Sequence, residues 1–414
     1  MRNIREINEI RVLKAVRENA PISRATLARM LGLSRAAMSG IVQRLMQLGL
    51  LVEIGKGQST ARGGRKEILL ALNAEAAVLL AADIDVGEVH LGLLDLEANF
   101  MREHTFQYAV DESPEQVLEE LVRAFRRMLR SAGVKRSSVL GLGLAIPGII
   151  DYNRGVLSEA YALKHWPGFP IREYLEKKLQ VPVFLENDVK ALAIGEYHFG
   201  DGFNVENLVT LWIGEGIGAG IILEGQLIRG ASSSAGEVGF NAVATPSHMD
   251  TEIRSLLLPD QTPLTWSDVL THENLRRATQ LAIEKGWLTS TNGTSDPLKI
   301  LVKRANDGDD LAQRILKGFG QFAGLVCTDL IHTLNPQLIT LSGRIFSETQ
   351  VVYEALKKQV MRDTLRSPVE AVSIQPSQLG PAGMLKGAAG LIVSDLFNVP
   401  NTRHSGKVQR KLLT

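Results

Sequence analysis

The sequence has a single cysteine and no long apolar run. Cys327 is the one cysteine in 414 residues, which excludes an intrachain disulfide framework and a zinc site built on several thiolates. No run approaches the roughly 18 uncharged apolar residues that a transmembrane helix needs. The N-terminus, MRNIREINEIRVLK, lacks the apolar core of a signal peptide. We therefore expect a cytoplasmic protein with no membrane partner.

The composition is that of a folded globular protein. Hydrophobic residues make up 45% of the chain and charged residues 22%, which excludes a disordered chain, a collagen and a coiled-coil rod. A chain of 414 residues is long enough for two to three domains, each with a core of its own.

Charge is divided unevenly along the chain, although the net charge is only +1. Residues 1–72 hold 13 Lys and Arg against 5 Asp and Glu, and the remaining residues hold 33 against 40. A basic module joined to an acidic body indicates that only the front of the chain meets a polyanion.

Three helices are predicted before residue 49. Ser23 and Ser34 can cap the second and third helices, and Gly32 allows the tight turn between them. This spacing is typical of a helix-turn-helix. The expected inward positions are Ile4, Ile7, Ile10, Leu13, Val16, Leu27, Met30, Leu31, Met38, Ile41, Val42, Leu45 and Leu48.

Two apolar runs, 50–54 and 68–72, then flank a polar, glycine-rich loop, which predicts the β-hairpin wing of a winged helix-turn-helix. Small or basic side chains at the start of the third helix suit entry into the major groove. The predicted DNA contacts are Ser34, Arg35, Ala36, Ala37 and Ser39 on this helix, and Arg62, Gly63, Gly64, Arg65 and Lys66 on the wing. A three-helix module that binds another protein is the alternative.

From residue 78 the pattern changes to strands alternating with helices. A strand hairpin, a helix at 114–132 and the buried run VLGLGLAIPGIID come first, and a second glycine-punctuated hairpin follows at 208–230. This order predicts an α/β body of two related lobes, with a small ligand in the cleft between them. The tail 401–414 is polar and basic, and we expect it to be loosely ordered.

Several motifs of the body resemble the ROK family of repressors and sugar kinases. They are the run at 141–200, GEGIGAGIILEGQLIRGASSSAGEVGF at 214–240, NPQLITLSGRIF at 335–346 and LGPAGMLKGAAGL at 379–391. With the winged helix in front, the chain is similar to the transcriptional-repressor branch. The resemblance implies an α/β fold in which an N-terminal winged helix-turn-helix precedes a two-lobed, actin-like (ribonuclease H-like) ATPase or sugar-kinase body.

The domain boundaries follow from the same comparison. We expect a DNA-binding domain at 1–72 and a first lobe at 78–190 that a C-terminal helix at about 381–398 completes. A second lobe at 191–380 is expected to carry a dimerisation surface.

Kinases of this family carry two glycine-rich phosphate loops, and this chain departs from both. The first corresponds to residues 83–87, DIDVG, and the second to residues 214–216, GEG. Asp85 and Glu215 thus place carboxylates where phosphates would lie, and like charges 4 Å apart repel by about 4 kcal/mol at an effective dielectric constant of 20. One glycine of a Gly-Gly pair is also lost at Ser342–Gly343. We therefore expect no kinase activity and no cofactor.

The resemblance also indicates the effector site. Asp188 matches the aspartate that accepts the sugar proton in family kinases, and here we expect it to bind a ligand; the alternative is that it caps the following helix. In the family's zinc motif Phe240 replaces the histidine and no cysteine follows nearby, so no metal is expected. His248, Asp250 and Glu252 form a makeshift ligand set or, alternatively, a solvated turn. The predicted ligand-binding residues are Gly148, Asn187, Asp188, Glu237 and Phe240.

The sequence therefore predicts a transcriptional regulator, a repressor of carbohydrate-metabolism genes. Its expected partners are a pseudo-palindromic operator, a sugar or polyol effector, and further copies of itself in a dimer or a dimer of dimers. Two alternatives stay open: a sugar kinase with an accessory DNA-binding domain, and a ligand-blind regulator controlled by a protein partner.

Overall fold

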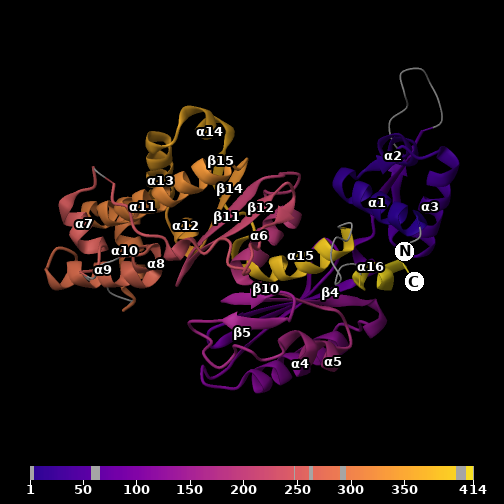
Figure 1. The fold of residues 1–414 in the computed structure, drawn as a ribbon, viewed down its shortest axis with the longest axis horizontal. Helices are drawn as coiled ribbons and strands as arrows, with labels where there is room; N and C mark the ends of the chain where they lie inside the picture. The colour runs from indigo at the N-terminus through magenta and orange to yellow at the C-terminus, as the bar shows by residue number, and fades with distance from the viewer. Residues whose placement is uncertain are drawn as a thin grey trace. The chain divides into compact units, whose positions relative to one another are not determined.

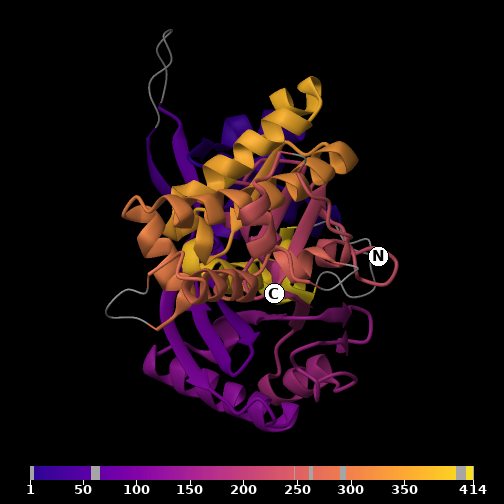
Figure 2. The ribbon, with the colours of Figure 1, turned by 90° about the vertical axis from the view of Figure 1, so that its left-hand side faces the viewer.

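The computed structural model describes residues 4–56, 66–246, 248–260, 264–289, 295–397 and 407–413. These residues form two compact units, shown in Figures 1 and 2. The first unit comprises residues 1–191 and 384–414, and the second comprises residues 192–383. Within the described ranges, no helix is both long enough and apolar enough to span a bilayer.

The N-terminal module of the first unit is a winged helix-turn-helix, as predicted. Its elements are α1 Ile4–Asn19, β1 Ile22–Ser23, α2 Arg24–Leu31, α3 Arg35–Gln47, β2 Leu51–Lys56 and β3 Ile68–Leu72. The Ser23 hydroxyl accepts a hydrogen bond from the Thr26 N–H and the Ser34 hydroxyl accepts one from the Ala37 N–H, both at 3.2 Å. The three strands pair antiparallel in the order β1-β3-β2.

The core of this module differs from the expected inward face at three positions. Ile4 is 76% exposed, Met30 is 50% exposed and Ile7 is 36% exposed, although all three fit the helical apolar pattern. The buried part of α1 begins only at Glu9, so the core covers the second half of that helix. Glu9 itself is buried, and its carboxylate forms ion pairs with Arg5 at 3.0 Å and Arg44 at 3.1 Å.

The rest of the first unit is built on a five-stranded mixed sheet in the order β10-β7-β4-β5-β6. The strands β4, β7 and β10 are parallel, and β5 and β6 continue the sheet antiparallel. Figure 1 shows α4 and α5 on one side of this sheet and α15 on the other. The elements are η1 Ala74–Ala76, β4 Val78–Asp85, β5 Glu88–Leu94, β6 Phe100–Gln107, α4 Pro114–Ser131, η2 Arg136–Ser138, β7 Val139–Ile146, β8 Ile149–Asp151, β9 Val156–Glu159, α5 Ile171–Leu179, β10 Val183–Asn187 and α15 Gly383–Phe397.

The tail does not match the expectation of loose order, because residues Lys407–Leu413 form a helix, α16. The Lys411 ammonium donates a hydrogen bond to the carbonyl of Val139 on β7. The Arg44 guanidinium of α3 donates another, at 3.0 Å, to the Leu413 carbonyl. Partners far away in the sequence therefore order a segment whose composition alone predicts a coil.

The second unit is built on a second five-stranded sheet in the order β13-β12-β11-β14-β15, in which β11, β14 and β15 are parallel. The helix α6 Asp188–Phe199 carries the chain into it. The other elements are β11 Leu208–Ile213, β12 Ile217–Leu223, β13 Gln226–Leu227, η3 Val238–Phe240, α7 Thr251–Leu257, α8 Trp266–Val269, α9 His272–Glu284, α10 Pro297–Asn306, α11 Asp310–Leu334, β14 Leu338–Ser342, α12 Arg344–Glu348, α13 Gln350–Asp363, α14 Arg366–Ala371, β15 Ser373–Pro376 and η4 Gly380–Ala382.

The helices α11 and α13 lie side by side in this unit, as Figures 1 and 2 show. Two of the three glycines of α11 permit this close approach, while Gly318 lies against Ile253 and Leu257 of α7; close packing at these glycines is what the sequence predicts. A Cβ atom at Gly320 would collide with the Val352 carbonyl, and one at Gly324 would lie 2.5 Å from the Gln359 Cβ.

One glycine of the first unit makes a testable contribution to stability. A Cβ atom at Gly143 of β7 would overlap the backbone carbonyl of Ala388 on α15. We expect Gly143→Ala to destabilise the protein by about 1–3 kcal/mol, the usual cost of overpacking a core. Gly40→Ala is the matched control, because Gly40 on α3 has open space around it and alanine there should be neutral or stabilising by up to about 1 kcal/mol. Denaturant melts that show equal stability for both variants would contradict this account.

Candidate DNA interface and effector-binding residues

The start of α3 presents the predicted DNA contacts on an open surface. Ser34, Arg35, Ala36, Ala37 and Ser39 are all exposed, while the next apolar position, Met38, is buried and 1% exposed. The Ser34 cap fixes the first turn of the helix, whose free N–H groups and dipole favour a phosphate. The arrangement is that of a recognition helix with small side chains at its leading end.

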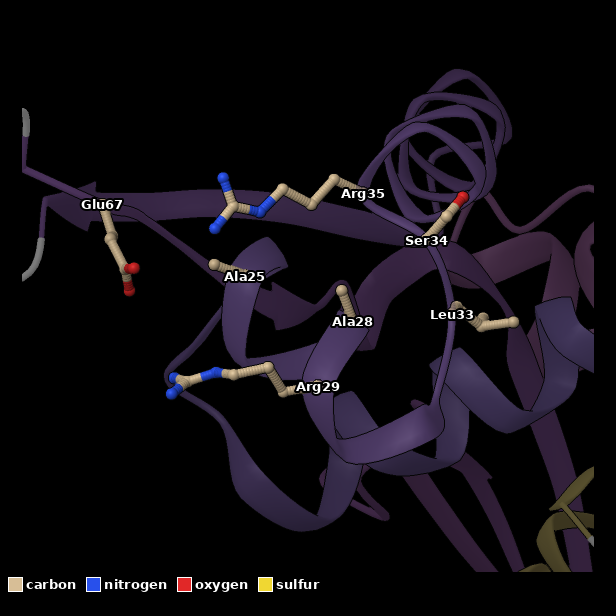
Figure 3. A pocket seen from close by; sticks show the side chains of 7 residues that line it. All are labelled: Ala25, Ala28, Arg29, Leu33, Ser34, Arg35 and Glu67. Carbon is tan, nitrogen blue, oxygen red and sulfur yellow. The ribbon is translucent and has the colours of Figure 1, made fainter.

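Beside this helix start lies a hollow of about 580 Å³. It is lined by Ala25, Ala28, Arg29, Leu33, Ser34, Arg35 and Glu67. Figure 3 shows the side chains of Arg29 on α2 and Arg35 on α3 extending toward the same side, where Glu67 also lies. Arg29 is exposed and is a candidate contact that the sequence analysis missed, although its place in the last turn of α2 was readable from the sequence.

The wing is described only at its two strands. Lys66, just before β3, is exposed. The other predicted wing contacts, Arg62, Gly63, Gly64 and Arg65, lie outside the described residues, so their role stays a prediction.

In the first unit, three of the predicted ligand-binding residues come together. The strands β4, β7 and β10 are parallel, so their carboxyl ends meet at one edge of the sheet, where open α/β folds bind ligands. Asn187 ends β10, and its amide donates hydrogen bonds to the Gly148 carbonyl at 3.1 Å and to the Asp188 carboxylate at 2.8 Å. Asn187, Asp188 and Gly148 thus form one polar cluster.

Helix capping is shared between two residues of this cluster. The side-chain oxygen of Asn187 accepts a hydrogen bond from the Lys190 N–H at 3.1 Å, which is the capping contact of α6. Asp188 accepts one from the Val189 N–H at 2.8 Å. The structural role that was the alternative for Asp188 therefore falls mainly to Asn187.

A second carboxyl group, that of Asp83, belongs to the same edge and was not predicted as a site residue. It pairs with Ala145 of β7, which in turn pairs with Glu186 of β10. Burial raises the pKa of Asp83 well above its usual value, and the nearby charges of Asp188 and Asp85 raise that pKa further. When protonated, the Asp83 carboxyl group can donate a hydrogen bond as well as accept one.

The segment that corresponds to the first phosphate loop is a tight strand hairpin. Asp85 pairs with Glu88 across the turn at Val86 and Gly87. The Val86 N–H donates a hydrogen bond to the Asp85 carboxylate at 2.7 Å. A backbone donor that could face a phosphate is thus engaged by an internal carboxylate.

An internal carboxylate also lies at the second loop, between β11 and β12. Arg276 of α9 binds both oxygens of Glu215, at 2.9 and 3.0 Å. The N–H of His272, the first residue of α9, donates to the Gly214 carbonyl at 2.8 Å. Arg276 lowers the pKa of Glu215. The charge repulsion expected from Glu215 is therefore largely offset, while its carboxylate fills the space beside the helix start.

His272 completes this cluster. It is 6% exposed, and its Nε2 has no hydrogen-bond partner among the described residues. Burial lowers the pKa of His272 despite the neighbouring Glu215, so the imidazole is neutral near pH 7.

The remaining two predicted ligand residues belong to the second unit. Glu237 directly precedes η3 and Phe240 ends it. The Phe240 ring is 52% exposed, so this unit's own core does not cover it.

The three side chains considered as makeshift metal ligands are engaged elsewhere. Asp250 and Glu252 both accept hydrogen bonds from Arg314. The Nε2 of His248 lies 3.2 Å from the Gln321 amide nitrogen. These contacts are those of a structured turn that begins α7.

Comparison with known proteins agrees with this architecture. A model of the ROK family matches residues 80–394, and a model of the MarR family matches residues 6–65. The chain is 26% identical to a xylose repressor of Bacillus subtilis (strain 168), over 96% of this chain and 97% of that protein. It is 24% identical to the DNA-binding transcriptional repressor Mlc of Escherichia coli (strain K12), over 95% of each chain.

Solved structures share the fold. A ROK family transcriptional regulator, a homologue of the E. coli Mlc protein, superimposes with a TM-score of 0.79 at 21% identity and covers 99% of both chains. The ROK hexokinase of Thermus thermophilus superimposes with a TM-score of 0.58 at 26% identity, covering 76% of this chain and 97% of that one.

The roles of Arg35 and Arg29 can be separated by DNA binding. We expect Arg35→Ala to weaken binding and relax base preference at one position, since a bidentate base contact contributes about 1–3 kcal/mol of discrimination. Arg29→Ala should weaken binding to all sequences alike and lower the salt slope by about 1, because a phosphate contact carries no sequence information. Selection from random duplexes followed by titration at several salt concentrations measures both effects.

The control for this experiment is Arg123→Ala, a change at an exposed position of α4, which should leave DNA binding unchanged. Full affinity and full base preference in Arg35→Ala would refute the assignment of α3 as the recognition helix.

The buried carboxyl group of Asp83 predicts a pH effect on stability. Its folded-state pKa is raised, so the folded protein keeps a proton that the unfolded chain loses above a pKa of about 3.9. Stability therefore falls as pH rises through that interval, by up to about 1.4 kcal/mol per pH unit. Asp83→Asn should melt higher than the parent protein at pH 8, with a gap that narrows toward pH 4. Exposed Asp111→Asn should show no such trend, and a gap independent of pH would contradict the assignment.

Proposed function

Because this chain belongs to the ROK family, we propose that it is a DNA-binding transcriptional repressor of carbohydrate-metabolism genes whose operator affinity responds to a sugar or polyol. The observation that carries the proposal is the union of two parts. A winged helix-turn-helix with an open recognition helix is joined to a sugar-kinase-like α/β body. Two curated relatives that match this chain over nearly their full length are named as repressors.

The effector is proposed to bind at the polar cluster of the first unit. Asn187, Asp188 and the Gly148 carbonyl offer donors and acceptors close together, which suits a ligand rich in hydroxyl groups. Asp83 adds a group that can donate. Glu237 and Phe240 lie in the second unit and stay separate predicted ligand contacts.

Ligand binding would control DNA affinity through linked equilibria. An effector shifts a protein between two conformations only if it binds them with different affinities, and the DNA then shifts effector affinity by the same factor. A dimer that places two α3 helices on two half-sites would explain a pseudo-palindromic operator, and operator binding implies action in the cytoplasm.

Loss of phosphoryl transfer is part of the proposal. Phosphoryl transfer depends on donors and cations placed around the phosphates. At the first loop the Val86 N–H is taken by Asp85, and at the second the Arg276 guanidinium is taken by Glu215. At each loop the kinase alternative therefore has one donor that is already engaged within the chain.

The proposal is tested by melting and DNA binding with a panel of sugars, polyols, phosphosugars and ATP–Mg. A sugar at 100 times its Kd should add about 2.7 kcal/mol of stability, and the same sugar should change the affinity for a selected operator. Asp188→Asn should retain DNA binding but lose the sugar response, with exposed Asp111→Asn as the matched control.

Two results would overturn this assignment. Sugar phosphorylation by ATP that Asp188→Asn abolishes would establish the kinase alternative. Operator binding that no member of the panel alters would favour a regulator controlled by a protein partner.

A further inference from the structure

A second hollow lies in the second unit, on the face shared by α11 and α13. It has a volume of about 500 Å³, within the range of small-molecule sites. The two helices that form its walls lie side by side in Figures 1 and 2. Its lining residues are His248, Lys317, Gln321, Gln350, Val351, Glu354, Ala355, Lys358, Gln359 and Arg362. None of these residues belongs to the DNA interface or to the polar cluster of Asn187, Asp188 and Gly148, which we call the effector cluster.

The hollow has mainly apolar walls and a set of side chains with net positive charge. Its lining includes Lys317, Lys358 and Arg362 and a single acid, Glu354, so these four side chains together carry a charge of +2. Within the described ranges these cations have weak partners or none. The Lys317 ammonium lies 3.5 Å from the Gln313 side-chain oxygen, the Arg362 Nε lies 3.8 Å from the Asp363 carboxylate, and Lys358 has neither a hydrogen bond nor an ion pair. Their positive charge is therefore available to a ligand.

A buried amide adds a second, independent feature. Gln359 is 2% exposed, and its amide nitrogen donates to the Asp363 carboxylate. Its side-chain oxygen is buried without a hydrogen-bond partner among the residues that the structure describes. Leaving a buried acceptor unpaired is costly, and a hydroxyl group of a bound ligand could supply the missing donor after a small side-chain adjustment.

We propose that this α11/α13 hollow is a second ligand site, and that it takes a phosphorylated sugar or a closely similar hydroxylated phosphate monoester. A phosphate monoester carries a charge of about −1.5 to −2 at pH 7 and has three strong acceptor oxygens, which complements the net charge of the lining. Two lysines and an arginine provide the donors that bind such a group. The sugar hydroxyls supply donors for the Gln359 oxygen, and Val351 and Ala355 provide an apolar wall.

The effector cluster is poorly suited to the same ligand. Asp83, Asp85 and Asp188 bring carboxyl groups together there, and a phosphate would be repelled by those that are ionised. The two sites are therefore proposed to differ in the charge of their ligands, and the second does not depend on the sugar response proposed above.

Calorimetric titration of the full chain with glucose 6-phosphate, glucose and inorganic phosphate tests the proposal. We expect saturable binding of glucose 6-phosphate, and weaker binding of inorganic phosphate. The double substitution Lys317→Ala and Lys358→Ala should weaken the binding of glucose 6-phosphate about tenfold or more. A hydrogen bond to a charged group contributes enough free energy for a change of that size. Gln359→Leu should weaken the binding of glucose 6-phosphate without changing the affinity for inorganic phosphate.

The matched control is the pair Lys299→Ala and Lys303→Ala, which removes the same charge from exposed positions of α10 and should leave binding unchanged. Asp188→Asn separates the two sites, since it should remove a sugar response and leave glucose 6-phosphate binding intact. Melting curves confirm that each variant is folded.

Three results would overturn the proposal. Absence of glucose 6-phosphate binding would refute it directly. Equal affinity for inorganic phosphate and glucose 6-phosphate would indicate an adventitious ion only. A change of sedimentation in Lys317→Ala with Lys358→Ala, without any ligand binding by the parent protein, would show that this face pairs with a second copy of the chain.

Discussion

The parallel pairing of β4, β7 and β10 is the constraint on which the rest of the first unit depends. Its register places Asp83, Ala145 and Glu186 across one line of the sheet, so the chain leaves all three strands at the same edge. Asn187 then caps α6 and fixes the Gly148 carbonyl with the same side chain. One amide therefore holds the helix start and the following loop of β7 together. The cost of this arrangement falls on Asp83, whose pKa is raised by burial and then by the neighbouring charges of Asp188 and Asp85.

The two loops that match the family's phosphate loops each engage a carboxylate within the chain. In each, a carboxylate of the chain accepts the hydrogen bonds that a phosphate would accept: Asp85 from the Val86 N–H, and Glu215 from Arg276. Glu215 gains further from its place beside the first residues of α9, where the helix dipole favours negative charge. An anion would have to displace an ion pair that is already formed. The ion pair weakens the repulsion that Glu215 alone would exert, and it also occupies the Arg276 guanidinium.

Local features of the structure could be predicted from the sequence because local chemistry determines them. Ser23 and Ser34 cap their helices as expected, and the apolar runs of the wing form β2 and β3. The partnership of Glu215 with Arg276 could not be predicted, since 61 positions separate the two residues. The same holds for α16, whose contacts reach back to Val139 and Arg44. For Ile4 and Met30 the sequence predicts burial that the structure does not show. Helical periodicity identifies the apolar face of a helix, but it does not tell how much of that face packs against other elements.

The candidate DNA interface at the start of α3, the effector cluster and the α11/α13 hollow differ in the charge of their side chains. The start of α3 and the hollow carry uncompensated cations, whereas the edge of the first sheet carries carboxyl groups. A neutral polyol would suit the effector cluster proposed above, because its hydroxyl groups both donate and accept hydrogen bonds. A phosphorylated ligand would be repelled by the carboxyl groups that are ionised. The parallel register of the sheet thus sets the chemistry of this edge, because it brings the Asp83 and Asp188 carboxyl groups close enough to interact.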